Sequence, residues 1–201
     1  STIQTILGLR KVAKNPNFSS LLLVGALIAA PFMAYLALAS YIYIDGFGVS
    51  ETTFSMYFAL NAGASILGPV MYMRFGAGSV KKVISAGIIV AIISAILILT
   101  IGNASPIIFL LSYVLYSIMT SYFRPLISDL LLSATKTDVG ATSSVMNFGF
   151  TVIGSIGMVV GSLQWSSYTG GLGITMLIFI ALTMIVWLYL LKAKSIRFDW
   201  K

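Results

Sequence analysis

VISAGIIVAIISAILILTI, residues 83–101, contains no charged side chain; Lys81 and Lys82 precede it, and the polar GNAS of residues 102–105 follows it. A helix needs about 20 consecutive apolar residues to cross the hydrocarbon core of a bilayer, so this run has the length of one membrane span. Of the 201 residues in the chain, 59% are hydrophobic and 8% are charged, whereas soluble domains carry about 25% charged residues. We therefore predict an all-α membrane protein.

Five more apolar runs of similar length lie along the chain. The six predicted transmembrane helices cover the runs 18–43, 53–73, 83–101, 106–130, 140–163 and 171–191. Together they form one bundle over residues 17–192. Residues 1–16 place apolar side chains near one helix face beside basic residues, so we predict a cytoplasmic amphipathic segment there. Residues 193–201 are predicted as a basic cytoplasmic tail.

Basic residues gather at alternate ends of these runs. Lys and Arg lie before the first run, between the second and third, between the fourth and fifth, and after the sixth: Arg10, Lys11, Lys14, Arg74, Lys81, Lys82, Lys136, Lys192, Lys194, Arg197 and Lys201. The other connections carry Asp45 and Glu51 alone among charged residues. Because cytoplasmic loops collect Lys and Arg, both termini are predicted to be cytoplasmic, in a plasma membrane whose lipid surrounds the bundle. The basic residues are too few for a nucleic-acid-binding face, so no nucleic acid partner is predicted.

The chain contains no cysteine and no histidine. This composition removes thiol nucleophiles, histidine bases and the usual zinc and haem ligands, so we predict no cofactor and no metal site. Every lysine falls in a predicted cytoplasmic segment, which leaves an intramembrane serine without a base beside it. We predict that the chain is not an enzyme.

The fourth run carries a stripe of polar residues at helical spacing: Tyr113, Tyr116, Ser117, Thr120 and Arg124. In lipid such a stripe must face protein or water, because unpaired polar groups are costly there. It forms either interhelical hydrogen bonds or the wall of a polar cavity that ends at Arg124. Arg124 lies about 27 Å along this helix, near the predicted cytoplasmic face, so snorkelling to the interface is the alternative for its charge.

The second and fifth runs share the pattern N-x-G-x-x-x-x-G: Asn61, Gly63 and Gly68 in one, Asn147, Gly149 and Gly154 in the other. These two runs cross the membrane in opposite directions. We therefore predict two sets of three helices related as a 3+3 inverted repeat, an arrangement known in several transporter folds. Each asparagine needs a partner within the membrane, which is either a neighbouring helix or a bound solute.

Small residues in these runs are predicted to let helix backbones approach closely. The predicted packing positions are Gly63, Gly68, Gly149, Gly154, Gly157 and Gly161. Met33 lies on a face of small residues in the first run and suits an adaptable apolar surface, although plain packing is the alternative.

Together these features resemble the C-terminal six-helix half of a major facilitator superfamily transporter, over nearly the whole chain. RFGAGSVKK, residues 74–82, is similar to the short inner loop of that family through Arg74, Gly76, Lys81 and Lys82, although Met73 stands where the fuller motif has an aspartate. The segment from FRPLISDLLL at 123–132 to GATSSVMNFGF at 140–150 resembles helices ten and eleven of the drug-exporter (Bcr/CflA-like) branch.

The resemblance implies export of a small molecule by alternating access between two six-helix halves, driven by protons. It adds weight to Met33, Asn61, Tyr113, Tyr116, Thr120, Arg124 and Asn147 as residues that line a substrate cavity. The predicted spans contain no carboxylate at mid-depth, so proton coupling would use residues outside this chain, and the partner would be an N-terminal six-helix half. The alternatives are a six-span solute-binding subunit of an importer and a half-transporter that dimerises with itself.

Overall fold

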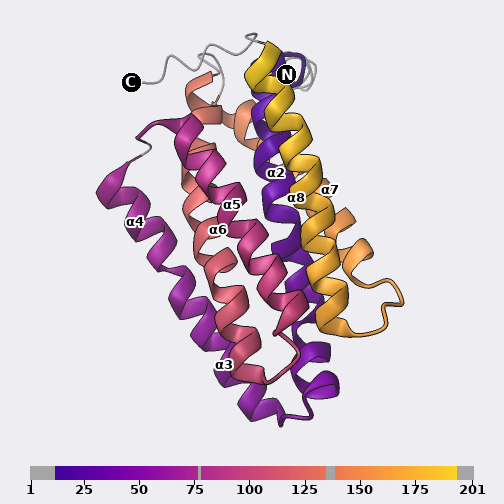
Figure 1. Ribbon diagram of the computed structural model, residues 1–201. Coiled ribbons are helices and arrows are strands. Elements are labelled where there is room, and N and C mark those ends of the chain that lie inside the picture. Colours follow the sequence, from indigo (N-terminus) through magenta and orange to yellow (C-terminus); the bar gives the residue numbers. More distant parts are fainter. Residues whose placement is uncertain (1–11, 77, 135–138, 194–201) are drawn as a thin grey trace.

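The computed structural model describes residues 12–76, 78–134 and 139–193, and all regular structure in them is helical (Figure 1). In chain order the elements are α2 (Pro16–Ser40), η1 (Tyr41–Gly46), α3 (Glu51–Ser65), α4 (Leu67–Phe75), α5 (Val80–Thr100), α6 (Pro106–Ala134), α7 (Val139–Gly161) and α8 (Tyr168–Ala193). Most of the predicted segment 1–16 and of the predicted tail 193–201 lies outside the described residues.

Six stretches are long and apolar enough to cross a membrane. They are Pro16–Gly46, Glu51–Phe75, Val80–Thr100, Pro106–Ser133, Val139–Gly161 and Tyr168–Lys192. Each overlaps one predicted run with ends that differ by a few residues, so the predicted all-α architecture with six candidate membrane spans is confirmed. Two stretches combine elements: η1 extends α2, and α3 and α4 form one rod with a break at Ile66.

Capping side chains, a proline and a glycine mark several helix ends. The Asn15 side chain accepts hydrogen bonds from the backbone N–H groups of Asn17 and Phe18 at the start of α2, with Pro16 in its first turn. Ser50 caps α3 by accepting from the Thr53 N–H at 3.2 Å. Such caps satisfy N–H groups that have no partner within the helix. Gly76 ends α4 with φ of 65°, a conformation that favours glycine.

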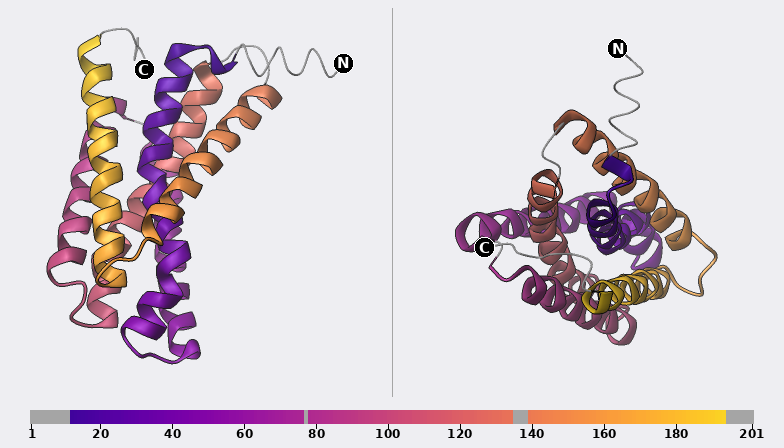
Figure 2. Two further views of the ribbon diagram at one scale, coloured as in Figure 1. Left: turned by 90° about the vertical axis from the view of Figure 1, so that its right-hand side faces the viewer. Right: turned by 90° about the horizontal axis from the view of Figure 1, so that it is seen from above.

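The helices stand side by side with α2 in the middle, in contact with α6, α7 and α8 (Figures 1 and 2). The α3–α4 rod packs mainly on α6, α5 packs on α6 and α8, and α7 crosses α2 diagonally (Figure 2). We call the end of the bundle where α2 begins the Pro16 end and the opposite end the η1 end. The first and last described residues both lie at the Pro16 end (Figure 1).

Burial is uneven among the six candidate spans. In the most apolar part of each span, 67% of residues are buried in the one containing α2, but only 11% in the α3–α4 rod and 17% in α7. The exposed apolar side chains of the weakly buried spans include Leu60 and Ile66 on the rod and Phe148 and Val159 on α7. In this chain by itself, α2 is therefore a core helix, and the rod and α7 have little of their surface covered.

Aromatic rings fill the bundle toward the η1 end. Tyr35 stacks on Tyr113 with ring centroids 4.0 Å apart, and Tyr43 stacks on Tyr57 at 5.1 Å. The Phe109 ring contacts both pairs: it lies beside Tyr35 and edge-on to Tyr43, with the Phe109 and Tyr43 centroids 5.4 Å apart. Stacked and edge-to-face geometries at these separations are favourable for ring pairs. We call these rings (Tyr35, Tyr43, Tyr57, Phe109 and Tyr113) the ring cluster. They pack together between α2, η1, α3 and α6.

Candidate functional site

The polar stripe on α6 divides into two parts. Tyr113, Tyr116 and Ser117 are fully buried. Tyr113 stacks on Tyr35, the Tyr116 hydroxyl donates to the Ile28 carbonyl on α2, and the Ser117 hydroxyl pairs with that of Ser65 on α3 at 2.6 Å. These three residues hold helices together, which is the first of the two predicted interpretations of the stripe.

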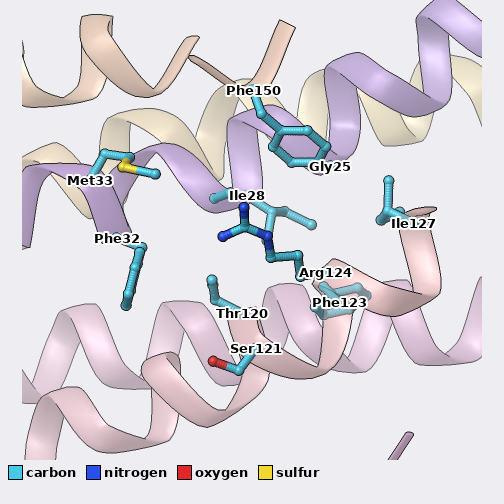
Figure 3. Close-up of a pocket in the computed structure, with 11 residues that line it drawn as sticks. Gly25, Ile28, Phe32, Met33, Thr120, Ser121, Phe123, Arg124, Ile127 and Phe150 are labelled. Atoms are coloured by element: carbon cyan, nitrogen blue, oxygen red, sulfur yellow. The ribbon is translucent and has the colours of Figure 1, made fainter. Parts of the chain in front are cut away.

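The other part of the stripe, Thr120 and Arg124, faces a cavity of about 100 Å³ between α2, α6 and α7 (Figure 3). The residues around it are Gly25, Ile28, Ala29, Phe32, Met33, Thr120, Ser121, Phe123, Arg124, Ile127 and Phe150. The lining is mainly apolar and aromatic. Its polar side chains are Thr120, Ser121 and Arg124, all from α6. We refer to this space as the Arg124 cavity.

Arg124 is exposed at the mouth of this cavity, and its side chain crosses from α6 toward α2. Figure 3 shows the guanidinium among Ile28, Phe32 and Phe150 and directed away from Ile127. Because Ile127 lies nearer the Pro16 end, the side chain does not run toward the predicted cytoplasmic face. Helix geometry explains the direction, since long side chains lean toward the N-terminus of their helix.

Among the described residues, no aspartate or glutamate lines the Arg124 cavity. Asp129, the nearest carboxylate along α6, accepts a hydrogen bond from the Tyr72 hydroxyl at 2.5 Å and so faces the α4 side of that helix. Within the described part of the chain, the cavity lining therefore carries one cationic side chain and no carboxylate.

The seven predicted cavity residues do not form one group. The structure brings Met33, Thr120 and Arg124 together around the cavity. Tyr113 and Tyr116 lie closer to the η1 end in helix contacts, and Asn147 is exposed on α7. Asn61 is 3% exposed, on the rod one turn before Ser65, and its side-chain oxygen has no hydrogen-bond partner. Three of the seven thus line the Arg124 cavity, and the role of all seven in a substrate cavity stays a prediction.

Two aromatic residues of the cavity, Phe32 and Phe150, were not singled out from the sequence. Gly25, Ala29 and Phe32 are spaced at i, i+4 and i+7, which places them on one face of α2. That periodicity was available in the sequence. The pairing of this face with Thr120 and Arg124 depends on tertiary packing, which no local pattern contains.

Five of the six predicted packing glycines lie against another helix. A Cβ at Gly68 would come within 2.5 Å of the α6 backbone at Ile118 and Tyr122, and one at Gly157 would collide with the Ala30 carbonyl. Gly149, Gly154 and Gly161 face Leu22, Met33 and Ala34 of α2. Gly63 differs, because a Cβ there would meet nothing within 4 Å. No described residue packs on Gly63, so its packing role stays a prediction.

The residues of the predicted inner-loop motif lie where α4 turns into α5. Arg74 is in the last turn of α4, and the Gly76 carbonyl accepts a hydrogen bond from the Tyr122 hydroxyl at 2.7 Å, which ties the turn to α6. Lys81 and Lys82 lie in the first turn of α5 and are exposed. The motif is thus at the Pro16 end, apart from the Arg124 cavity.

Three buried tyrosine hydroxyls in the ring cluster, those of Tyr35, Tyr43 and Tyr113, also have no hydrogen-bond partner. The described residues contain no group of three acidic, histidine or cysteine side chains arranged to hold a metal ion.

These observations define a multi-pass membrane protein of six candidate spanning helices, with a cationic cavity between α2, α6 and α7. No protein-family model matches the chain, and no curated protein matches it significantly.

Proposed function

We propose that the chain is one half of a secondary active transporter that exports a small molecule across the plasma membrane by alternating access. The observation that carries this proposal is the uneven burial of the spans. The core helices α2 and α6 are well buried, whereas the α3–α4 rod and α7 flank them with apolar faces that no described residue covers. A second six-helix half packed against these faces would complete a pathway past the Arg124 cavity.

The resemblance to the C-terminal half of a major facilitator transporter supports the same proposal. It includes the inverted repeat, although its two copies have different surroundings here: Asn61 is buried and Asn147 is exposed. On this proposal the Pro16 end is cytoplasmic, both termini are inside, and the missing half supplies the carboxylate for proton coupling. The chain carries out transport and no covalent chemistry.

Site-directed cysteine labelling tests the proposal, because these 201 residues contain no cysteine. Ser121→Cys places a thiol in the lining of the Arg124 cavity, while Glu51→Cys and Lys192→Cys mark the η1 end and the Pro16 end. Each variant is made in the complete natural gene product, with any cysteines elsewhere replaced, and is treated with a membrane-impermeant maleimide on intact cells or on everted vesicles.

We expect Glu51→Cys to react only on intact cells and Lys192→Cys only on everted vesicles. Ser121→Cys should react from both sides, in proportions that change when a proton gradient is imposed. Reaction of Ser121→Cys from one side under all conditions would contradict alternating access and favour a binding subunit. Exchange of the two control patterns would overturn the orientation. Crosslinking between two copies of the chain would identify the second half as the chain itself.

A further inference from the structure

We infer that the Arg124 cavity binds a small organic anion with a single-ring apolar body, whose carboxylate or similar group pairs with the Arg124 guanidinium. As a statement about the transported substrate, this inference rests on the proposed function. As a statement about binding, it rests on the cavity alone.

The charge of the cavity is the first argument. Charged residues within membrane spans characteristically mark substrate or ion pathways, and Arg124 carries its charge at the exposed mouth of a mainly apolar cavity. In the part of the chain that the structure describes, the lining contains Arg124 and no acidic side chain. Asp129 lies five positions further along α6 and is bonded to Tyr72. A bound anion would provide the missing charge through two parallel N–H···O bonds, the geometry that guanidinium and carboxylate share.

The direction of the side chain sets where a ligand would lie. The ordinary lean of helical side chains toward the N-terminus of their helix carries the Arg124 guanidinium across the cavity mouth toward Ile28 and Phe32 (Figure 3). An anion that pairs with its guanidinium would therefore have its remaining atoms among the apolar side chains of α2 and α7.

The shape and lining define the rest of the ligand. Phe32, Phe123 and Phe150 contribute rings from three helices, and Met33 adds a flexible thioether. The volume of about 100 Å³ is of the order of the roughly 150 Å³ apolar cavity known to hold benzene. A space of this size limits the apolar body to a single ring. Thr120 lies one turn before Arg124 on α6 and contributes to the same lining.

Three matched probes test this inference: 3-phenylpropionate, 3-phenylpropanol and 3-phenylpropylammonium, which share ring and linker and differ in charge. Binding is measured by equilibrium dialysis to the complete gene product in nanodiscs of zwitterionic lipid, with empty nanodiscs subtracted. We expect the anion to bind at least about tenfold more tightly than the alcohol, which corresponds to about 1.4 kcal/mol, because hydrogen bonds between two charged groups are stronger than those to a neutral hydroxyl. The ammonium should bind least.

The variants separate Arg124 from charge in general. Arg124→Gln should abolish the preference for the anion while leaving binding of the alcohol unchanged, which also shows that the fold is intact. Arg124→Lys should restore part of the preference. Arg74→Gln removes the same charge from the exposed last turn of α4 and should change nothing. Equal affinity for anion and alcohol in the wild type, an unchanged preference in Arg124→Gln, or no binding of any probe up to about 10 mM would each overturn the inference.

A lipid headgroup is the competing anion. Nanodiscs in which about a third of the lipid is phosphatidylglycerol should bind phenylpropionate as well as zwitterionic ones. If phenylpropionate no longer bound in that lipid, Arg124 would be a headgroup site and the inference would be overturned.

An uptake experiment distinguishes a failure of this inference from a failure of the proposed function. Energised everted vesicles containing the gene product are assayed for uptake of radiolabelled phenylpropionate and of a cationic dye. Binding that depends on Arg124, without uptake of either solute, would contradict the transporter and leave the site standing. Uptake of the dye without binding of the anion would leave the transporter standing and remove this substrate class.

Discussion

The two halves of the α2–α6 interface differ in how they fill the same space. Toward the η1 end, Tyr35 and Tyr113 stack with ring centroids 4.0 Å apart, and Phe109 lies edge-on to Tyr43 of η1. Toward the Pro16 end, the same two helices leave the Arg124 cavity between them. The hydrogen bond from Tyr116 to the Ile28 carbonyl lies at the boundary. One pair of helices thus supplies both a closed region and an open one, and residue size along the facing surfaces decides which is which.

Removal of a ring should separate the two halves most clearly. Tyr35→Ala should lower the free energy of unfolding by about 3–5 kcal/mol, as for large aromatic truncations in packed cores, because Tyr35 is fully buried and contacts three other rings. Phe32→Ala, beside the cavity and half-buried, should cost less than half as much. The measurement is reversible unfolding in mixed detergent micelles. Equal losses would show that the cavity half is as tightly packed as the ring half.

Addition of volume should give the opposite contrast at a smaller scale. Ala39→Leu inserts a side chain into a fully packed region and should cost about 1–3 kcal/mol through overpacking, since Ala39 is buried in the core on the same face as Tyr35. Ala29→Leu points into the cavity lining and should be neutral or stabilising in the same unfolding assay. A destabilising Ala29→Leu would mean that the cavity collapses around its present residues and has no room to spare.

Removal of a single tyrosine hydroxyl should change stability differently at the boundary and inside the ring-filled half. Tyr116→Phe removes the donor to Ile28 and should cost about 0.6 kcal/mol, the average measured for interhelical hydrogen bonds in a membrane protein. Tyr113→Phe removes a hydroxyl with no partner, so it should be neutral or slightly stabilising. Unfolding of both variants in parallel checks this order. A larger loss for Tyr113→Phe would reveal a polar group bound to that hydroxyl.

The six spans could be predicted from the sequence because hydropathy and length act locally. An apolar run such as 83–101 must leave water whatever its neighbours are. The π-helical turn at η1 and the break of the α3–α4 rod at Ile66 were not predicted. η1 covers the end of the first predicted run and reaches Asp45 and Gly46, and the break precedes Pro69, which lacks the N–H that would bond to the Ser65 carbonyl.

The site was only partly predictable. Arg124 and Thr120 were found because polar residues are conspicuous in a membrane span. Phe32 and Phe150 were missed because a phenylalanine that faces lipid and one that faces a cavity look alike in sequence. Asn61 and Asn147 occupy equivalent motif positions, yet one is buried and the other exposed. Only the placement of neighbouring helices separates these cases.

The π-helical turn of η1 has a consequence for the length of the chain. Its hydrogen bonds, such as the one from the Phe47 N–H to the Ile42 carbonyl, span five residues where an α-helix spans four. Each such hydrogen-bonded turn therefore contains one residue more than an α-helical turn at the same place. A homologue one residue shorter at this corner could close it with an ordinary α-turn. The register that sets Tyr35 against Tyr113, and Phe32 against Arg124, would then remain unchanged.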